Sequence, residues 1–136
     1  MTHRLIRPDQ PSAADRETVL APLRAYNIAQ AGDPRIQQVA ILIDGAEGGL
    51  WGRISYDWLF VELLAVPEAA RGTGLGRQLM DQAETIAREA GCTGIWLDTY
   101  EFQARGFYEK LGFTLFGTLP DHPVGQSRFF MMKRLV

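Results

Sequence analysis

Apolar residues recur along the chain at two spacings, which divide it into predicted helices and strands. A spacing of three to four residues is typical of a helix with one buried face, and it covers two long segments. The first runs from Ser12, a candidate N-cap, to Gly32, where Pro22 predicts either two pieces or a later start near Leu20. The second is Gly74–Ala90, whose apolar and charged side chains separate onto two faces.

Short apolar runs bounded by Gly, Pro and Asp predict strands elsewhere. Trp58–Val66 is the most apolar of them, and apolar residues on both alternating faces predict a central strand covered on both sides. Strands followed by alternating helices and strands are typical of a layered α/β domain with a mixed sheet. The other predicted elements are a short helix at Ala104–Leu111 and strands at His3–Arg7, Gln38–Ile43, Leu50–Tyr56, Gly94–Thr99, Phe113–Thr118 and Arg128–Leu135.

Size and composition narrow the class of protein. The chain has 136 residues, of which 46% are apolar and 22% charged. This fits one domain, residues 1–136, that buries a core without metal or disulfide support. Cys92 is the one cysteine, so an internal disulfide is excluded and a reducing compartment is indicated. No apolar run approaches the roughly 18 residues of a membrane span. We therefore expect a soluble, cytoplasmic protein.

Charge argues against two kinds of partner. Fourteen Lys and Arg against 16 Asp and Glu give a formal net charge of −2. The basic residues are scattered rather than gathered in a stripe, so nucleic acid is not expected as a partner. The two histidines and Cys92 lie far apart in the sequence, so no metal site is expected either. Cys92 itself, beside Gly91 at a predicted helix end, is interpreted as a small buried residue.

The clearest candidate for chemistry is the turn between the strand at 58–66 and the helix at 74–90. Glycines allow positive φ and close approach of a ligand, and the first amides of a helix have no internal partner. With the helix dipole they favour an anion such as a diphosphate, which Arg71 and Arg77 can also contact. The alternative is a tight turn without a ligand. The turn reads Arg71, Gly72, Thr73, Gly74, Leu75, Gly76.

Two common phosphate-binding motifs do not fit this turn. A nucleotide P-loop needs Gly-Lys-Ser/Thr at its end, but Gly76 is followed by Arg77 and Gln78. A dinucleotide fingerprint beginning at Gly72 would need glycine at position 77, and too few residues follow for the rest of that fold.

Two sequence blocks carry a resemblance to a known family. One is an Arg/Gln-x-x-Gly-x-Gly/Ala signature after a Leu-x-Val strand, matched by Arg71, Gly74, Gly76, Leu64 and Val66. The other is a helix reading roughly Ala-x-x-Leu-Tyr-Glu-Lys-Leu-Gly-Phe, matched by Ala104 and Phe107–Phe113. Together they make the chain resemble the GNAT superfamily of acyl-CoA-dependent N-acyltransferases over nearly its whole length.

The resemblance implies a strongly twisted mixed sheet, splayed between the strand ending at Val66 and the strand Gly94–Thr99, with acetyl-CoA in the gap. It implies that the pantetheine pairs with the backbone of Leu64, Ala65 and Val66. The implied activity is transfer of acetyl to a primary amine by direct attack, without a metal. The implied diphosphate-binding amides are those of Gly72, Thr73, Gly74, Leu75, Gly76 and Arg77.

Two residues are candidates for proton transfer in this reaction. Tyr108 occupies the family's Tyr position, where the hydroxyl points at the thioester sulfur as an acid; the alternative is ordinary packing. Glu62 is the candidate base, because apolar neighbours would desolvate its carboxylate. A solvated carboxylate, or deprotonation through water, is the alternative. Strict alternation places Glu62 on one face with Trp58, Phe60, Leu64 and Val66.

Several further residues are expected near the acceptor, whose identity stays open with a lean toward a small cationic amine. Glu101 stands where many relatives carry an Asn that contacts CoA. His122 lies in the loop before the last strand, where the alternatives are contact with the acceptor and an ordinary solvated loop residue. A homodimer is expected, with Arg128–Leu135 as a pairing edge. A non-catalytic acyl-CoA module and a nucleotide-binding domain are the alternative functions. Residues expected to flank the cleft are Tyr56, Asp57, Trp58, Tyr100 and Glu101.

Overall fold

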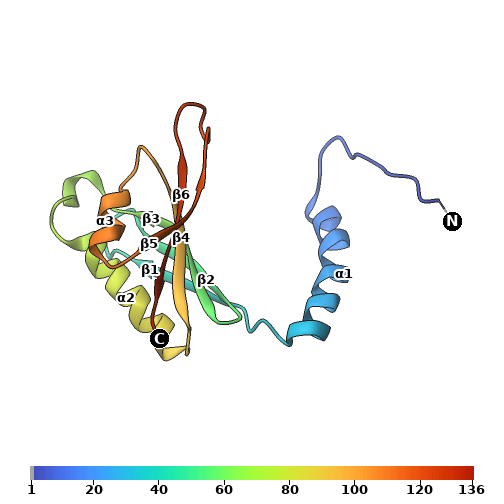
Figure 1. The fold of residues 1–136 in the computed structure, drawn as a ribbon, viewed down its shortest axis with the longest axis horizontal. Coiled ribbons are helices and arrows are strands. Elements are labelled where there is room, and N and C mark those ends of the chain that lie inside the picture. The colour runs from blue at the N-terminus through green and yellow to red at the C-terminus, as the bar shows by residue number, and fades with distance from the viewer. Residues whose placement is uncertain (1) are drawn as a thin grey trace. The chain divides into compact units, whose positions relative to one another are not determined.

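A computed structural model describes residues 2–136 and divides them into two units (Figure 1). One unit ends at Pro34 and holds the helix α1 (Ala13–Ala31). The other, Arg35–Val136, holds a six-stranded sheet and the remaining helices. No helix in these described residues is long and apolar enough to cross a membrane.

Two predictions about the secondary structure of the first unit are wrong. α1 is one continuous helix with Pro22 inside it, so the predicted division there is wrong. A capping box sets its start well before Pro22: the Ser12 hydroxyl accepts from the Asp15 amide at 3.1 Å, and the Asp15 carboxylate accepts from the Ser12 amide at 2.9 Å. The predicted strand His3–Arg7 is also wrong, since this stretch joins no sheet and Leu5 is 92% exposed.

The second unit is the mixed α/β layer structure that the sequence predicts. Its strands lie in the order β1-β2-β3-β4-β6-β5. β3 and β4 are parallel and every other neighbouring pair is antiparallel. The elements are β1 (Gln37–Leu42), β2 (Gly49–Ser55), β3 (Trp58–Ala65), the short 3-10 helix η1 (Glu68–Ala70), α2 (Leu75–Glu89), β4 (Gly94–Tyr100), α3 (Arg105–Lys110), β5 (Thr114–Leu119) and β6 (Arg128–Arg134).

The core lies between the sheet and the apolar stripe of α2. The buried residues of the helix are Leu79, Met80, Ala83 and Ala87. They belong to one cluster with strand residues, the largest of which are Leu59, Ile95, Leu97 and Met131. Full burial of such a side chain contributes roughly 1.5–3 kcal/mol. This cluster therefore holds α2 against the sheet, and residues 66–74 join it to β3. Cys92 is buried in the same cluster, as predicted.

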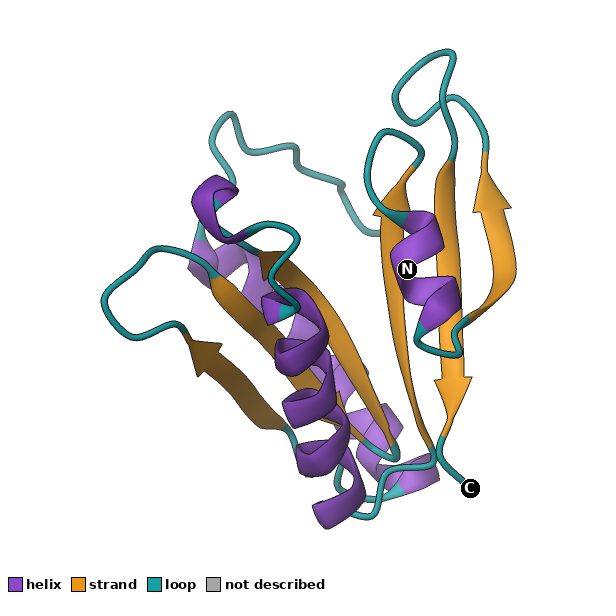
Figure 2. Cartoon of the chain, turned by 90° about the vertical axis from the view of Figure 1, so that its left-hand side faces the viewer, coloured by secondary structure: helices purple, strands orange, loops and turns teal. Residues whose placement is uncertain are grey.

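The sheet splits between β3 and β4. These strands pair only from Trp58–Val61 to Gly94–Leu97, although β3 continues to Ala65 and β4 to Tyr100. Figure 2 shows the two groups of strands diverging beyond this point, with α2 beside one and α3 beside the other. The splay that the family resemblance implies is thus present in the fold.

Two expectations about individual strands are wrong. β6 pairs with β4 on one side and β5 on the other, so it is not an edge; the edges of the sheet are β1 and β5. β3 is central in the strand order, but it is not covered on both faces, because Leu63 is 61% exposed.

Candidate active site

The loop between β3 and α2 presents a row of unpaired amides. η1 uses the amides up to Arg71 in its own turn. The next amide that donates is that of Gln78, to the Gly74 carbonyl at 3.0 Å. Among residues 2–136, the amides in between, from Gly72 to Arg77, donate to no other group. Unpaired amides at the start of a fifteen-residue helix form a site for an anion.

Two glycines allow this arrangement. Gly74 is the N-cap of α2 and has the left-handed backbone conformation, with φ 85° and ψ 6°, which a side chain disfavours. Gly76 is needed for close packing, because a Cβ there would lie 3.3 Å from Cζ of Phe107 and 3.5 Å from Cγ2 of Val66. The glycine signature therefore serves both the turn and the contact between α2, α3 and the end of β3.

The cationic side chains of this loop are available to a ligand. Arg71 and Arg77 are exposed, and neither forms an ion pair within residues 2–136. The Thr73 hydroxyl is oriented by donating to the Ala70 carbonyl. Guanidinium groups bind phosphate oxygens through paired hydrogen bonds, so both arginines can supplement the amides.

Beyond the split, β3 has one free edge. Leu64 and Ala65 pair with Leu50 and Gly49 of β2, and they have no strand partner on the side of β4. Backbone groups along a strand point alternately to its two edges, so part of this segment's N–H and C=O groups face the gap. An extended ligand with amide groups can pair there as an added strand. The loop of unpaired amides follows this edge after the single turn of η1, so a ligand that joins amides to a diphosphate fits both features.

Tyr108 lies in α3, only 9% exposed. Its ring packs edge-on against Phe107 at 5.1 Å and Phe113 at 6.0 Å between centroids. Burial raises the pKa of Tyr108 to about 12, and the negative charge of Asp98 adds to the rise. The phenol is therefore protonated at neutral pH, and its hydroxyl makes no hydrogen bond within the described residues.

Glu62 lies at the split, but its surroundings differ from the prediction. Gly52 pairs with Val61 and Trp51 pairs with Leu63, so Glu62 is the extra residue of a β-bulge. The bulge changes the phase of the alternation, and Leu64 packs on the buried cluster instead of sharing a face with Glu62. Glu62 is exposed, so the apolar surroundings predicted for its carboxylate are absent.

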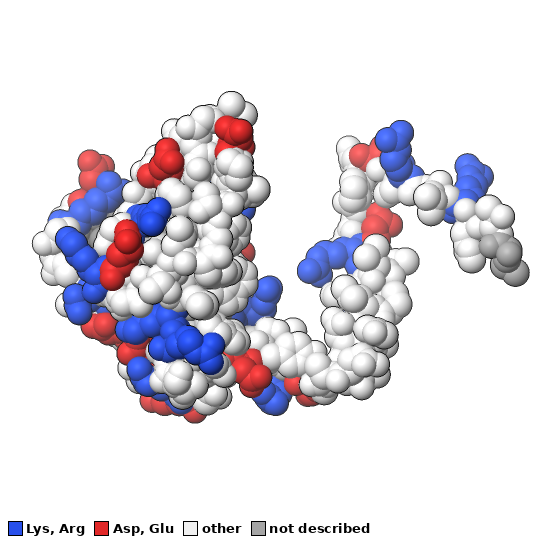
Figure 3. Space-filling view, in the orientation of Figure 1, with Lys and Arg blue, Asp and Glu red and all other residues white. Residues whose placement is uncertain are grey.

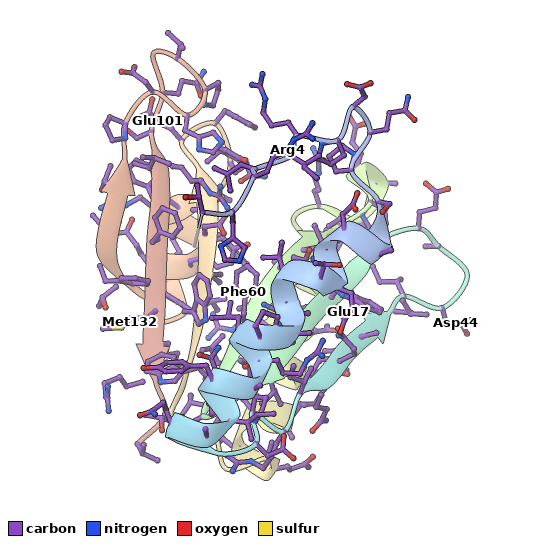
Figure 4. The ribbon with its side chains drawn as sticks, turned by 90° about the vertical axis from the view of Figure 1, so that its right-hand side faces the viewer. Arg4, Glu17, Asp44, Phe60, Glu101 and Met132 are labelled. Atoms are coloured by element: carbon purple, nitrogen blue, oxygen red, sulfur yellow. The ribbon has the colours of Figure 1, made fainter. Side chains whose placement is uncertain are left out.

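The residues predicted to flank one cleft lie at two ends of the sheet. Tyr56–Trp58 lies at the start of β3, which is the end away from the split because β3 and β4 are parallel. Asp57 there pairs with Arg35 at 3.2 Å. Tyr100 ends β4 beyond the split, and Glu101 follows it in the loop (Figure 4). Only the second group therefore lies at the end where β3 and β4 part, and the prediction of a single cluster is wrong.

The loop before β6 reaches the same end of the sheet. The ring of His122 meets that of Tyr100 edge-on at 5.5 Å, and Phe102 stacks on Tyr100 at 5.2 Å. This contact places His122 at the same end of the sheet as Tyr100, and its contact with an acceptor stays a prediction.

Sequence reasoning missed an ion pair at this end. Arg128 binds Asp98 through two contacts, Nε to Oδ1 at 2.9 Å and Nη2 to Oδ2 at 2.8 Å. Alternation along the predicted strand Gly94–Thr99 already placed Asp98 opposite the apolar face, which was the available signal. The partner was not predictable, because it depends on β6 lying beside β4.

Charge elsewhere on the second unit is mixed. On the face that Figure 3 draws, acidic and basic side chains are interspersed. Within residues 2–136, no group of three or more His, Cys, Asp or Glu side chains is placed to hold a metal ion. The arrangement at the split thus consists of a loop of unpaired amides, a free strand edge and a buried phenol.

A split sheet whose free edge leads into an amide-lined loop defines a class of proteins that bind an extended, diphosphate-bearing cofactor. Comparisons with known proteins agree. Residues 6–113 match the model of the Acetyltransferase (GNAT) family. The chain is 38% identical over 130 residues to Acetyltransferase Atu2258 of Agrobacterium fabrum, covering 93% of this chain and 95% of that protein.

Two further relatives support the same grouping. A crystal structure of a protein from Agrobacterium tumefaciens, assigned as an acetyltransferase, superposes with a TM-score of 0.91 at 36% identity, covering 98% of this chain and all of that one. The blasticidin-S acetyltransferase of Streptomyces morookaense is 45% identical over 89 residues, or 65% of each chain. The chain therefore belongs to the GNAT acetyltransferase family, as the sequence blocks indicated, and it is an acyltransferase that uses acetyl-CoA.

Proposed function

We propose that residues 1–136 act as one N-acetyltransferase domain that moves acetyl from acetyl-CoA to a primary amine by direct attack of the amine. The observation that carries the proposal is that the free edge of β3 is followed, one short turn later, by the unpaired amides of Gly72–Arg77. Two structural neighbours, each under 25% identical, were solved with acetyl coenzyme A and with coenzyme A. These complexes are consistent with the fit.

We assign the binding of the cofactor mainly to backbone groups. The free edge at Leu64, Ala65 and Val66 receives the pantetheine amides, and the loop amides with Arg71 and Arg77 receive the diphosphate. Backbone dipoles explain how a chain with net charge −2 can bind a polyanion. When bound, acetyl-CoA supplies the activated acetyl group.

Tyr108 is the proposed general acid. Its hydroxyl is protonated at neutral pH and has no partner within the described residues, so it is ready to donate a proton to the departing thiolate. A positioned acid or base typically contributes about 10²–10⁴-fold to a rate. Rigid packing between Phe107 and Phe113 holds the ring in place for that transfer.

Glu62 is the proposed base. The bulge places its carboxylate on the exposed side of β3, where the strand parts from β4. It can take the proton of an arriving ammonium group directly or through one water molecule. Exposure suits a group that must pass this proton to solvent.

The proposed acceptor is a small cationic amine. Glu62 and Glu101 form no ion pair within residues 2–136, and the charge of Asp98 is balanced by Arg128. Beyond the split, Glu62 and Glu101 are thus two carboxylates without a cationic partner, which favours cations beside them. One relative acts on blasticidin S by its name and another on streptothricin, which is compatible with a small-molecule acceptor.

We also propose a cytoplasmic homodimer. Its support is the apolar side of α1 formed by Val19, Leu23 and Tyr26, because this helix buries none of its residues within its own unit. Light scattering after gel filtration tests the dimer: a monomeric mass at micromolar concentration would reject it.

The proposed reaction is tested by release of free thiol from acetyl-CoA with a panel of primary amines. Titration calorimetry measures acetyl-CoA binding separately, with Gly74→Glu as a control that places a carboxylate among the loop amides. We expect binding by the native chain, loss of binding in the control, and thiol release with at least one cationic amine. Binding without turnover of any amine would reject the proposed reaction.

A further inference from the structure

The first residue of each strand beyond the split is a carboxylate. β3 and β4 pair for the last time at Val61 and Leu97, so Glu62 and Asp98 follow the last pair. Asp98 alternates with the buried Leu97 and Thr99, so it lies on the opposite face of β4. Its side chain is 15% exposed, far less than the freely solvated Glu62.

Arg128 fixes this carboxylate. It contacts one Asp98 oxygen through Nε at 2.9 Å and the other through Nη2 at 2.8 Å, a bidentate geometry that holds both groups. The guanidinium carbon lies 5.5 Å from the ring centroid of Tyr100 and 5.3 Å from that of Phe130. Two rings and a bidentate contact thus give Arg128 a defined position at the start of β6.

The pair leaves Asp98 able to bind a further donor. An ionised carboxylate offers about four lone-pair positions, and the two contacts with Arg128 occupy two of them. An ammonium group approaching this face can therefore be accepted by Asp98 without breaking the pair.

The charge of Asp98 is also felt at the proposed acid. Burial is the main cause of the raised pKa of Tyr108, and the Asp98 carboxylate is the second cause. Among the other charged groups near α3, Arg105 pairs with Glu109 at 3.4 Å and Lys133 of β6 with Glu84 of α2 at 2.6 Å, whereas Lys110, at the end of α3, forms no ion pair within residues 2–136. The Asp98 carboxylate therefore lies close enough to the Tyr108 hydroxyl to affect it electrostatically.

We propose that Asp98 and Arg128 determine which amines the site accepts: Asp98 binds the ammonium group of the acceptor, and Arg128 is a positioning residue that holds Asp98 and limits its charge. The inference rests on the proposed function. It names the substrate class as cationic amines without a carboxylate beside the amino group, because such a carboxylate would meet Asp98 and Glu62.

The test uses matched amines that differ by one carboxylate: phenethylamine and phenylalanine, cadaverine and lysine, histamine and histidine. The readout is the ratio of kcat/KM for the cation over kcat/KM for its carboxylated counterpart, at saturating acetyl-CoA. Asp98→Asn removes negative charge and lowers the ratio, whereas Arg128→Gln removes positive charge and raises it. Each change is roughly three- to fivefold, the size that partly exposed charge pairs give.

The opposite shifts of the kcat/KM ratio in the two variants distinguish a role in substrate choice from a purely structural role. Both variants break the same ion pair, so a purely structural effect moves both ratios in the same direction. Arg128→Lys keeps the charge and retains the native ratio. If Asp98→Asn fails to fold, the comparison of Arg128→Lys with Arg128→Gln still tests whether the charge at position 128 sets the ratio. Asp57→Asn, which removes one carboxylate at the other end of β3, is the matched control and leaves the ratio unchanged.

The outcomes distinguish the two proposals. If the native enzyme binds acetyl-CoA but acetylates no amine, the proposed function fails and this inference fails with it. If amines are acetylated but the carboxylated members are preferred, or the two variants shift the ratio alike or not at all, the role of Asp98 and Arg128 is overturned while the proposed function stands.

Discussion

Replacing Gly74 with Ala tests the anion-binding loop through its backbone. Gly74 has φ 85°, and nothing lies within 4 Å of a Cβ built there, so the substitution causes no steric clash. Its cost is conformational, because the left-handed region is disfavoured for a residue with a side chain by roughly 1–2 kcal/mol. For a chain of this size we expect the Tm to fall by about 3–6 °C for each kcal/mol lost.

The same change should weaken acetyl-CoA binding. Relaxation of the backbone at Gly74 turns the neighbouring amides away from the diphosphate, and one hydrogen bond to a charged group contributes about 1.5–3 kcal/mol. We therefore expect the Kd measured by titration calorimetry to rise about tenfold or more.

Gly91 supplies the matched control. It follows the other end of α2, has φ 75°, and likewise has no neighbour within 4 Å of a built Cβ. Gly91→Ala should therefore lower stability in urea as much as Gly74→Ala does, while leaving the Kd for acetyl-CoA unchanged. Equal loss of affinity in the two variants, or no loss in Gly74→Ala, would refute the assignment of these amides to the diphosphate.

Three other changes test the remaining assignments. Tyr108→Phe should lower kcat by roughly 10²-fold without changing the calorimetric Kd for acetyl-CoA, since an acid typically contributes about 10²–10⁴-fold; an unchanged kcat would remove the acid role. Glu62→Gln should lower kcat/KM most at neutral pH and least at alkaline pH, where the amine is already neutral, and a pH-independent deficit in the rate profile would contradict a base. Lys133 holds the pKa of Glu84 below its usual value through a contact of 2.6 Å. The stability that this pair contributes is present above the unfolded pKa and is lost as pH falls through the folded one. Glu84→Gln should therefore flatten the acid side of stability measured by urea unfolding from pH 5 to 3, and an unaltered slope would contradict this.

Local patterns predicted most of the second unit correctly. The helix at Gly74–Ala90 and the strands at 50–56, 94–99, 113–118 and 128–135 each lie within a residue or two of the observed elements. The periodicity of apolar residues in these elements is clear because each element buries one face in the common core. The loop at 71–77 was equally predictable, because glycine spacing reflects local backbone requirements that the sequence expresses directly.

Properties that depend on neighbouring strands were not predictable. Nothing in Arg128–Leu135 indicates that this strand inserts between β4 and β5, so its assignment as an edge was wrong. Asp57 and Glu101 were grouped as acids near strand ends, but the parallel direction of β3 and β4 separates them to opposite ends of the sheet. Strand order and direction are set by the packing of the whole sheet rather than by any one segment.

The bulge at Glu62 explains why the face of Leu64 was predicted wrongly. It also offers an explanation for the opening of the sheet between β3 and β4. One extra residue reverses the alternation that follows it, so the predicted face of Leu64 was wrong although the strand was right. A bulge also bends and twists its strand, and the last pair between β3 and β4, Val61 with Leu97, immediately precedes it. We infer that the bulge turns β3 away from β4 and so creates the free edge on which acetyl-CoA can pair. The residue at this bulge, Glu62, is exposed, and it is the carboxylate that we propose as the base.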